Sequence, residues 1–197
     1  MTATYERDEE LFDRCIRSLS RQTYRNFEHL IVRDGAPVRN AFDPRRLPPF
    51  TRYVELGRNW KYRKSAGTVP RLVGGYLALG KYIAYLDDDN EFLPDHLQLL
   101  TSVIESSGAD FVYSMASFAG PVGMLVGCDP PRRGGIDTNL LMHRPELLKV
   151  AHWTAGEYDD DWRVVEQWVA AGRSYRHIPS VTVRYHGDVR RTIIDSP

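Results

Sequence analysis

The feature that most constrains the fold of this chain is a run of β-forming residues followed by three consecutive aspartates. It spans Tyr82–Leu86 and continues into Asp87-Asp88-Asp89-Asn90. Apolar side chains occupy both alternating sets of positions in this run, which is typical of a strand covered on both faces in an α/β sheet. Because successive strand side chains point to opposite sides, Asp87 and Asp89 share one side and Asp88 takes the other. Such an Asp-x-Asp pair suits a hard ion, Mg²⁺ or Mn²⁺, shared with a phosphate. A solvated acidic turn is the alternative interpretation.

Length, charge and cysteine usage favour one cytoplasmic domain. The 197 residues can bury a substantial core, and 26 basic residues balance 26 acidic ones, which argues against nucleic acid as the main ligand. Cys15 and Cys128 have neither disulfide-framework nor zinc-site spacing. No apolar run reaches the ~20 residues that cross a bilayer, and Met1 to Glu10 do not form a secretory signal. Membrane association through a partner or a lipid acceptor is left open.

Hydrophobic periodicity predicts alternating helices and strands. The predicted helices cover 9–20, 69–79, 96–106 and 146–150 and run from Asp160 or Asp161 to Gly172; the predicted strands cover 27–32, 51–56, 82–86, 111–113, 140–142 and 181–185. Gly80 fits the position that follows a helix, and Asp95 fits a helix N-cap. The first seven residues are too short for a full leading strand. Without repeats or a linker, the pattern predicts a single α/β domain over residues 1–197.

Three further segments carry charge or irregular composition. Arg58, Lys61, Arg63 and Lys64 surround Trp60 and form either a solvated surface or a diphosphate contact.

Glycines and prolines fill residues 120–135, which also hold Arg132 and Arg133; this loop is either a lid over the ligand or a surface excursion. The second acidic run, Asp159-Asp160-Asp161, precedes a helical pattern, where carboxylates also complement the helix dipole. N-capping is therefore the structural alternative to a catalytic role for these three acids.

Five short motifs, in the right order, resemble the family 2 glycosyltransferases of GT-A fold over about residues 4–186. They are Thr4-Tyr5-Glu6-Arg7, similar to Thr-Tyr-Asn-Arg; residues 22–28, similar to Gln-Thr-Tyr-x-Asn-x-Glu; Val32-Arg33-Asp34-Gly35-Ala36, similar to Val-Asp-Asp-Gly-Ser; Pro70-Arg71-Leu72 with Gly74, similar to Ala-Arg-Asn-x-Gly; and Leu86 to Asn90, the metal motif. The chain departs from the family pattern at Arg33, which replaces an acid, at Leu72, which replaces an asparagine, and in its almost absent first strand.

The resemblance implies a GT-A, Rossmann-like fold with a mixed, mainly parallel sheet flanked by helices. Residues 1–90 would form the nucleotide-binding half and residues 91–197 the acceptor-side half. The implied activity is that of an inverting, metal-dependent hexosyltransferase. It would move a sugar from a nucleotide diphosphate sugar, with UDP favoured, to the hydroxyl of a carbohydrate, lipid-linked or other acceptor. Mn²⁺ or Mg²⁺ is the implied cofactor, nucleic acid is not a partner, and a homo-oligomer is left open.

The resemblance also implies roles for individual residues. Nucleotide-binding roles fall to Thr4, Tyr5, Glu6, Asp34, Arg71, Asp87 and Asp88; the metal ligands would be Asp89, Asp87 and His186; and the general base would be Asp161, with Asp160 or Asp159 as alternatives. Asp89 is the expected direct ligand, whereas Asp87 would hold the ribose or a metal-bound water. His186 is either a third ligand or a structural residue.

Two other classes of function stay open. A metal-dependent nucleotidyltransferase would also present acids at a strand end, but usually with a glycine-rich phosphate loop near the amino terminus, and none occurs between Met1 and Arg14. A non-catalytic nucleotide- or sugar-binding module would have no use for a base, so the second acidic run argues against it.

Overall fold

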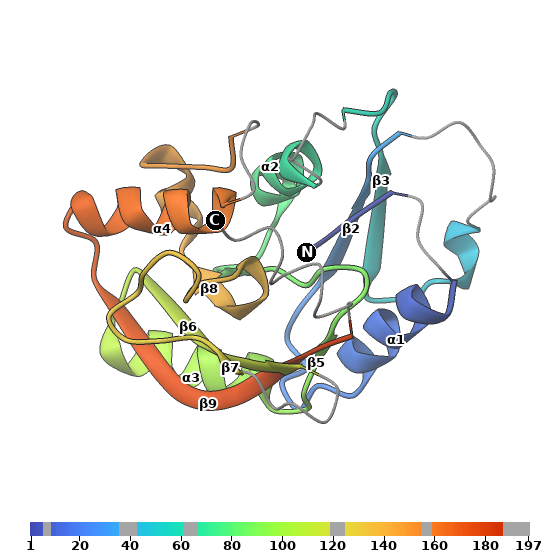
Figure 1. The fold of residues 1–197 in the computed structure, drawn as a ribbon. Helices are drawn as coiled ribbons and strands as arrows, with labels where there is room; N and C mark the ends of the chain where they lie inside the picture. The colour runs from blue at the N-terminus through green and yellow to red at the C-terminus, as the bar shows by residue number, and fades with distance from the viewer. Residues whose placement is uncertain (6–8, 36–42, 61–66, 119–124, 155–158, 187–197) are drawn as a thin grey trace.

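The computed structural model describes residues 1–5, 9–35, 43–60, 67–118, 125–154 and 159–186 as a mixed α/β protein (Figure 1). Its helices are α1 (Glu9–Ser20), α2 (Thr68–Leu77), α3 (His96–Ser107) and α4 (Asp160–Ala170), with 3₁₀ turns η1 (Pro44–Arg46), η2 (Thr138–Leu140) and η3 (Pro145–Lys149). Its strands are β1 (Thr2–Thr4), β2 (His29–Arg33), β3 (Thr51–Glu55), β4 (Ile83–Ala84), β5 (Glu91–Phe92), β6 (Phe111–Phe118), β7 (Leu125–Val126), β8 (Leu141–His143) and β9 (Tyr175–Tyr185).

The amino-terminal sheet is parallel and has the order β1-β2-β3. Beside β1 lies the segment that leads from β4 to the acids, because the Met1 nitrogen donates to the Ala84 carbonyl (2.6 Å) and Leu86 N–H donates to the Met1 carbonyl (3.0 Å). The carboxyl ends of parallel strands share one edge of a sheet, which is where α/β proteins bind ligands. This arrangement therefore brings the ends of β1 and β2 next to Asp87.

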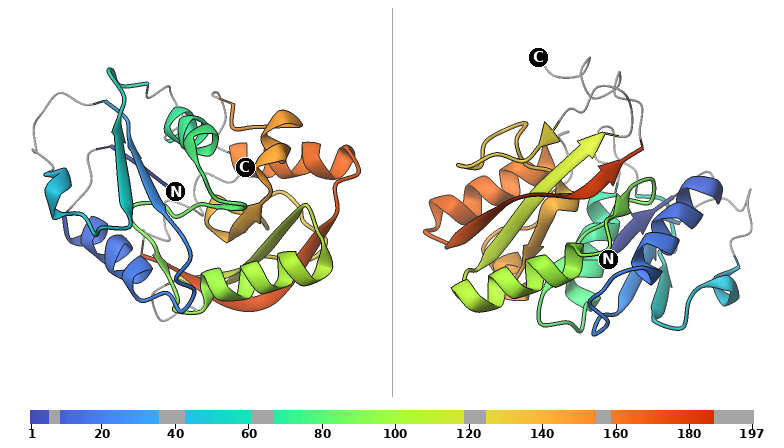
Figure 2. Two further views of the ribbon diagram at one scale, coloured as in Figure 1. Left: turned by 180° about the vertical axis from the view of Figure 1, so that it is seen from behind. Right: turned by 90° about the horizontal axis from the view of Figure 1, so that it is seen from below.

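The second sheet has the order β4-β8-β6-β9-β5, with β7 added to β6. Its long central strands β6 and β9 are parallel, while β8 is antiparallel to both β4 and β6. Helix α3 packs on β6 and β9, and Figures 1 and 2 show α4 on the opposite face. The α4 side chain Trp168 is fully buried there, with its ring 5.3 Å from that of Phe111. This sheet, together with α3 and α4, holds most of the hydrophobic core.

Most predicted elements are confirmed, but the strand predicted over 82–86 is wrong in extent, because β4 covers only Ile83–Ala84 and Asp88 and Asp89 lie in a turn. The alternation of strand side chains, which placed Asp87 and Asp89 on one side, therefore does not apply to them.

The other departures have local causes. The placement of Gly80 after a helix is wrong, because α2 ends at Leu77 and Ala78 is already extended. Asp95 does take the N-cap position of α3, but its carboxylate accepts from the Thr23 hydroxyl (3.1 Å) and makes no capping bond. Residues 145–149 form a 3₁₀ turn rather than an α-helix.

Strands β6 and β9 run longer than predicted. Polar residues interrupt the apolar pattern inside them, but Thr182 and Ser114 are buried and their hydroxyls bond each other at 2.6 Å. The register also shifts between the Tyr113 and Met115 pairings, opposite Pro179, whose missing N–H breaks a strand pattern. Among the described helices, none is long and apolar enough to span a membrane. The cytoplasmic location stays a prediction.

Candidate functional site

Three predicted nucleotide-binding residues, Thr4, Asp34 and Asp88, meet at the ends of β1 and β2 and the turn that holds Asp88 and Asp89. The Thr4 hydroxyl donates to Asp88 Oδ2 at 2.6 Å, and Asp34 N–H donates to the Thr4 carbonyl at 2.8 Å. Both carboxylates are buried. Burial raises the pKa of Asp34, although an N–H bond from Trp60 to its Oδ1 (2.8 Å) lowers it again. Tyr5 follows directly and is half-buried, whereas Glu6 lies outside the described residues.

The loop after β3 packs closely against the end of β2, at Asp34 and Gly35. Gly35 follows Asp34, and a Cβ there would lie 2.7 Å from the backbone nitrogen of Arg58, so only glycine fits. Arg58 stacks its guanidinium over the exposed Trp60 ring at 3.7 Å. One of the four cations of the predicted basic loop, Arg58, is therefore stacked on Trp60. The other cations of the loop, at positions 61, 63 and 64, lie outside the described residues.

Arg71 joins the donor-side acids to the second acidic run. It lies on α2, which Figures 1 and 2 show between the amino-terminal sheet and α4. Its Nη2 donates to Asp87 Oδ1 at 2.7 Å. Burial lowers the pKa of Arg71, but the charge and hydrogen bond of Asp87, together with the charges of Asp137 and Asp161, raise it above its usual value. Three carboxylates from three segments therefore act on one half-buried guanidinium, and Asp87 contacts it directly.

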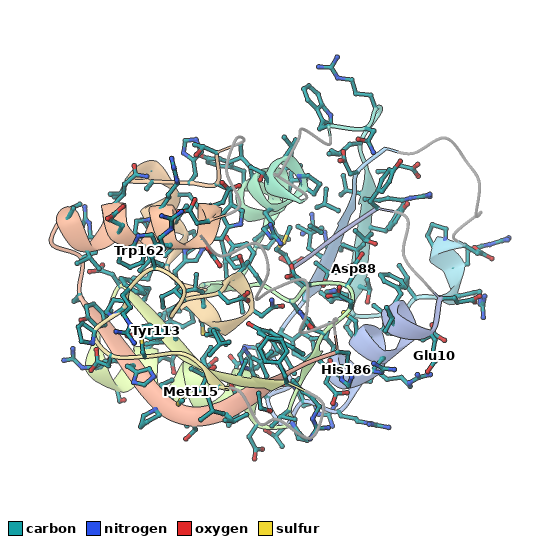
Figure 3. The ribbon with its side chains drawn as sticks, in the orientation of Figure 1. Glu10, Asp88, Tyr113, Met115, Trp162 and His186 are labelled. Carbon is teal, nitrogen blue, oxygen red and sulfur yellow. The ribbon has the colours of Figure 1, made fainter. Side chains whose placement is uncertain are left out.

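Asp161 is the acid whose environment most resembles that of a general base. It lies in the first turn of α4, beside the Trp162 labelled in Figure 3, and its Oδ1 accepts the Trp162 N–H at 2.7 Å. Burial raises the pKa of Asp161 to about 7; repulsion from Asp137 acts in the same direction, and Arg71 opposes it. A carboxyl group that titrates near neutral pH suits proton transfer.

The other two acids of this run are engaged in holding the helix. Asp160 Oδ2 accepts the Thr68 hydroxyl at 2.6 Å, which ties α4 to α2. Asp159 contacts Arg133 Nε at 2.9 Å and Arg163 Nε at 3.1 Å, and it makes no capping bond. The geometry favours Asp161 over its neighbours as the general base, and its role stays a prediction.

The loop predicted as a lid is only partly described. Arg133 contacts Asp159 in this structure. Its approach to a diphosphate and the closure of the lid stay predictions, and residues 119–124 lie outside the described ranges.

His186 lies at the end of β9, beside the metal motif. Its N–H donates to Asn90 Oδ1 (3.3 Å), and its Nε2 lies 3.4 Å from Glu91 Oε1. Glu91 also pairs with Arg184 at 2.8 Å. Burial lowers the pKa of His186 and favours the neutral imidazole that a metal requires. Figure 3 shows His186 and Asp88 in the central part of the molecule.

The residues fit a metal shared with a nucleotide better than a protein-only cage. Among the described residues, no group of three or more His, Cys, Asp or Glu side chains is arranged to hold an ion. Asp87 is engaged by Arg71, and His186 by Glu91. However, Mg²⁺-type ions need only one or two carboxylates when phosphates and water complete the shell. The half-buried Asp89, next to the held Asp87, meets that smaller requirement.

The sequence interpretation missed Asp137 and Asn139. Asp137 precedes the short turn η2, and its Oδ1 accepts the Asn139 N–H at 2.8 Å. That local bond is an Asx-type turn, which the Asp-Thr-Asn order could have indicated. The side chain of Asn139 is fully buried and contacts Asp87, 52 positions away in the sequence. No local pattern could have predicted that pairing.

Comparison of the sequence with known proteins identifies a family and two relatives. The model of the family described as "Glycosyl transferase family 2" matches residues 1–120. An uncharacterised glycosyltransferase of Rickettsia felis is 30% identical over 104 residues, and one of Rickettsia conorii is 31% identical over 107 residues. Each alignment covers 53% of this chain but only 16% of the relative, so the chain spans a small part of these proteins.

Solved structures share the fold at low sequence identity. S. aureus TarS 1–349 in complex with UDP has a TM-score of 0.72 and 15% identity over 95% of this chain and 61% of that one. The same protein in complex with UDP-GlcNAc gives 0.71 and 14%, over 100% of this chain and 60% of that one. At such identities the likeness concerns the fold alone, and it confirms the predicted GT-A fold.

Proposed function

Because this chain belongs to glycosyl transferase family 2, we propose that it transfers a sugar from a nucleotide diphosphate sugar to an acceptor hydroxyl. The complexes of S. aureus TarS with UDP and UDP-GlcNAc support a UDP-sugar as the donor. Residues 1–90 form the nucleotide-binding half in this proposal, and residues 91–197 form the acceptor-side half. The acceptor is a carbohydrate, a lipid-linked group or another hydroxyl compound.

The observation that carries the proposal is the convergence of both acidic runs on Arg71. Asp87 bonds Arg71 directly, and Asp161 lies within the electrostatic reach of the same guanidinium. Sugar transfer needs a site for the leaving diphosphate beside a base for the incoming hydroxyl. A binding module needs only the first of these.

On the donor side, the chain's own residues bind and orient the nucleotide. Asp34 accepts from the base edge, while Thr4 and Tyr5 flank the base. Arg71 bonds Asp87 and Thr4 bonds Asp88, so two of the three acids in this run have fixed positions. A bound Mn²⁺ or Mg²⁺ would neutralise the charge that develops on the diphosphate, and Asp89, with Asp87 beside it, would hold the ion.

On the acceptor side, Asp161 takes the proton from the acceptor hydroxyl. The oxygen then forms its bond to the anomeric carbon as the bond from that carbon to the diphosphate oxygen breaks. The nucleoside diphosphate leaves from the opposite face, so a single displacement inverts the configuration. With a pKa of about 7, Asp161 is ionised in a large share of molecules at neutral pH and still basic enough to accept the proton.

The test is an assay of several nucleotide sugars for transfer and hydrolysis, with and without Mn²⁺. Release of nucleoside diphosphate, stimulated by Mn²⁺ and by a carbohydrate acceptor, is the expected result. Pyrophosphate release from a nucleoside triphosphate and a sugar phosphate would instead indicate a nucleotidyltransferase. Nucleotide binding without any turnover would indicate a binding module.

A further inference from the structure

The side chain of Asn139 forms two hydrogen bonds with Asp87. Its Oδ1 accepts the backbone N–H of Asp87 at 2.6 Å, and its Nδ2 donates to Asp87 Oδ2 at 2.9 Å. The opposite carboxylate oxygen, Oδ1, takes the Arg71 donor at 2.7 Å. Because both oxygens and the amide of Asp87 are bonded, its side chain has one preferred orientation.

Asp137 sets which way the Asn139 amide points. Nδ2 of Asn139 also donates to Asp137 Oδ1 at 2.7 Å. An ionised carboxylate only accepts hydrogen bonds, so the amide nitrogen must face Asp137 and Asp87 Oδ2. The amide oxygen must then face the Asp87 N–H, since a flipped amide would place oxygen against two carboxylates. The three contacts agree on one orientation of Asn139.

We infer that Asn139, oriented by Asp137, is a positioning residue that fixes Asp87 for donor binding. The inference rests on the proposed function and adds a residue pair to its donor site. Asn139 lies in η2 and Asp137 directly before it, on the acceptor-side half of the sequence, so these hydrogen bonds also join the two halves. Residues that orient a ligand-binding carboxylate typically change affinity or activity by about 10- to 100-fold when removed.

A purely structural buried amide is the competing explanation, and the chain contains a matched example. Gln22 is also fully buried. Its Nε2 donates to the Leu93 carbonyl (2.8 Å) and the Ser18 carbonyl (3.3 Å), and its Oε1 accepts the Leu97 N–H (3.0 Å). Both amides thus make three side-chain hydrogen bonds, but those of Gln22 reach no residue of the proposed site.

The experiment compares Asn139→Ala, Asn139→Asp and Gln22→Ala with the wild-type chain. Calorimetry measures UDP affinity with and without Mn²⁺, and hydrogen exchange measures opening of the Asp87 amide without ligand. Both alanine variants should lower Tm, but only Asn139→Ala should weaken UDP binding, by about 10- to 100-fold, and speed exchange at Asp87. Asn139→Asp keeps the shape but loses the N–H donor, so it should weaken binding as well.

Equal UDP affinity in Asn139→Ala and wild type would overturn the inference. So would equal losses in Asn139→Ala and Gln22→Ala, since general destabilisation would then explain both. A wild-type chain that binds neither UDP nor any other nucleoside diphosphate would overturn the proposed function instead. In that case, unchanged exchange at Asp87 in Asn139→Ala would separately overturn the positioning of Asp87.

Discussion

The chain contains two runs of three aspartates, at residues 87–89 and 159–161, and the structure treats them in parallel ways. In each run the middle acid accepts a threonine hydroxyl at 2.6 Å: Asp88 from Thr4 and Asp160 from Thr68. In each run the first acid is paired with arginine. The third acids, Asp89 and Asp161, are the ones to which we assign the metal and the proton.

The two runs differ in how well their charge is compensated. Arg71, which pairs with Asp87, is only 15% exposed, whereas Arg133 and Arg163, which pair with Asp159, are 64% and 45% exposed. Exposed ion pairs are screened by water and contribute little. The charge of Asp159 in the second run is therefore weakly compensated, while burial and repulsion from Asp137 raise the pKa of Asp161. The comparison teaches that two similar acid runs can differ in the burial of their arginine partners, and our proposal gives them different roles.

The largest expected effect is that of Asp89→Ala on metal-dependent binding. Removing the proposed direct ligand should lower UDP affinity in Mn²⁺ by at least about 100-fold, since even indirect supports of a metal site cost 10- to 100-fold. The fold should persist, because the change relieves crowding among three acids. Calorimetry checks the affinity, with Asp13→Ala on the surface of α1 as the control. Unchanged affinity in Mn²⁺ would remove Asp89 from the metal site.

The next largest effect is expected for Asp161→Asn in the second run, which should change turnover but not donor binding. Asp161→Asn should leave donor binding near wild type and lower turnover by ~10² or more, the usual scale for a lost general base. Steady-state kinetics at saturating donor provides the measurement, and Asp160→Asn is the neighbouring control. Full activity in Asp161→Asn with loss in Asp160→Asn would move the role by one residue.

Much of this arrangement could be predicted from the sequence because its signals are local. Helical periodicity located α1 and α3, and the family-like motifs located Thr4, Asp34, Arg71 and both acidic runs. Sequence order also suggested that each run ends or begins a regular element. These inferences need only short-range patterns, which hydrophobic spacing and capping chemistry supply.

What could not be predicted depends on contacts between distant segments. The hydrogen bonds between Asn139 and Asp87 join residues 52 positions apart, and the bond from Thr68 to Asp160 joins residues 92 positions apart. The buried hydroxyls of Ser114 and Thr182 are satisfied by a hydrogen bond across two strands, and His96 Nδ1 also bonds the Thr182 hydroxyl. Such pairings follow from tertiary packing, which overrides local polarity.

A smaller effect tests the parallel between the two threonines. Thr4→Val and Thr68→Val each remove one hydroxyl donor to a buried carboxylate, which should cost about 1–3 kcal/mol of unfolding free energy. Urea unfolding measures the cost, and Thr23→Val is the exposed control. If only one of the two variants loses stability, the two runs are not held alike.

The smallest effect is expected at the exposed partners of Asp159. Arg163→Ala should cost less than about 1 kcal/mol, because this pair lies on the surface. The same urea experiment measures it, with salt added to screen the pair. A loss of several kcal/mol would show that the second run is compensated as strongly as the first, and the contrast between the runs would fail.

The dependence of turnover on pH tests the central claim most directly. Since the pKa of Asp161 is raised to about 7, the base is protonated below that pH and ionised above it. Turnover at saturating UDP-sugar and Mn²⁺ should therefore rise from pH 5 and level off above an apparent pKa of about 7. Asp161→Asn should lose this step along with most of its rate. A wild-type rate that stays constant from pH 5 to 8, or a step of equal pKa in Asp161→Asn, would contradict the assignment of Asp161 as the base.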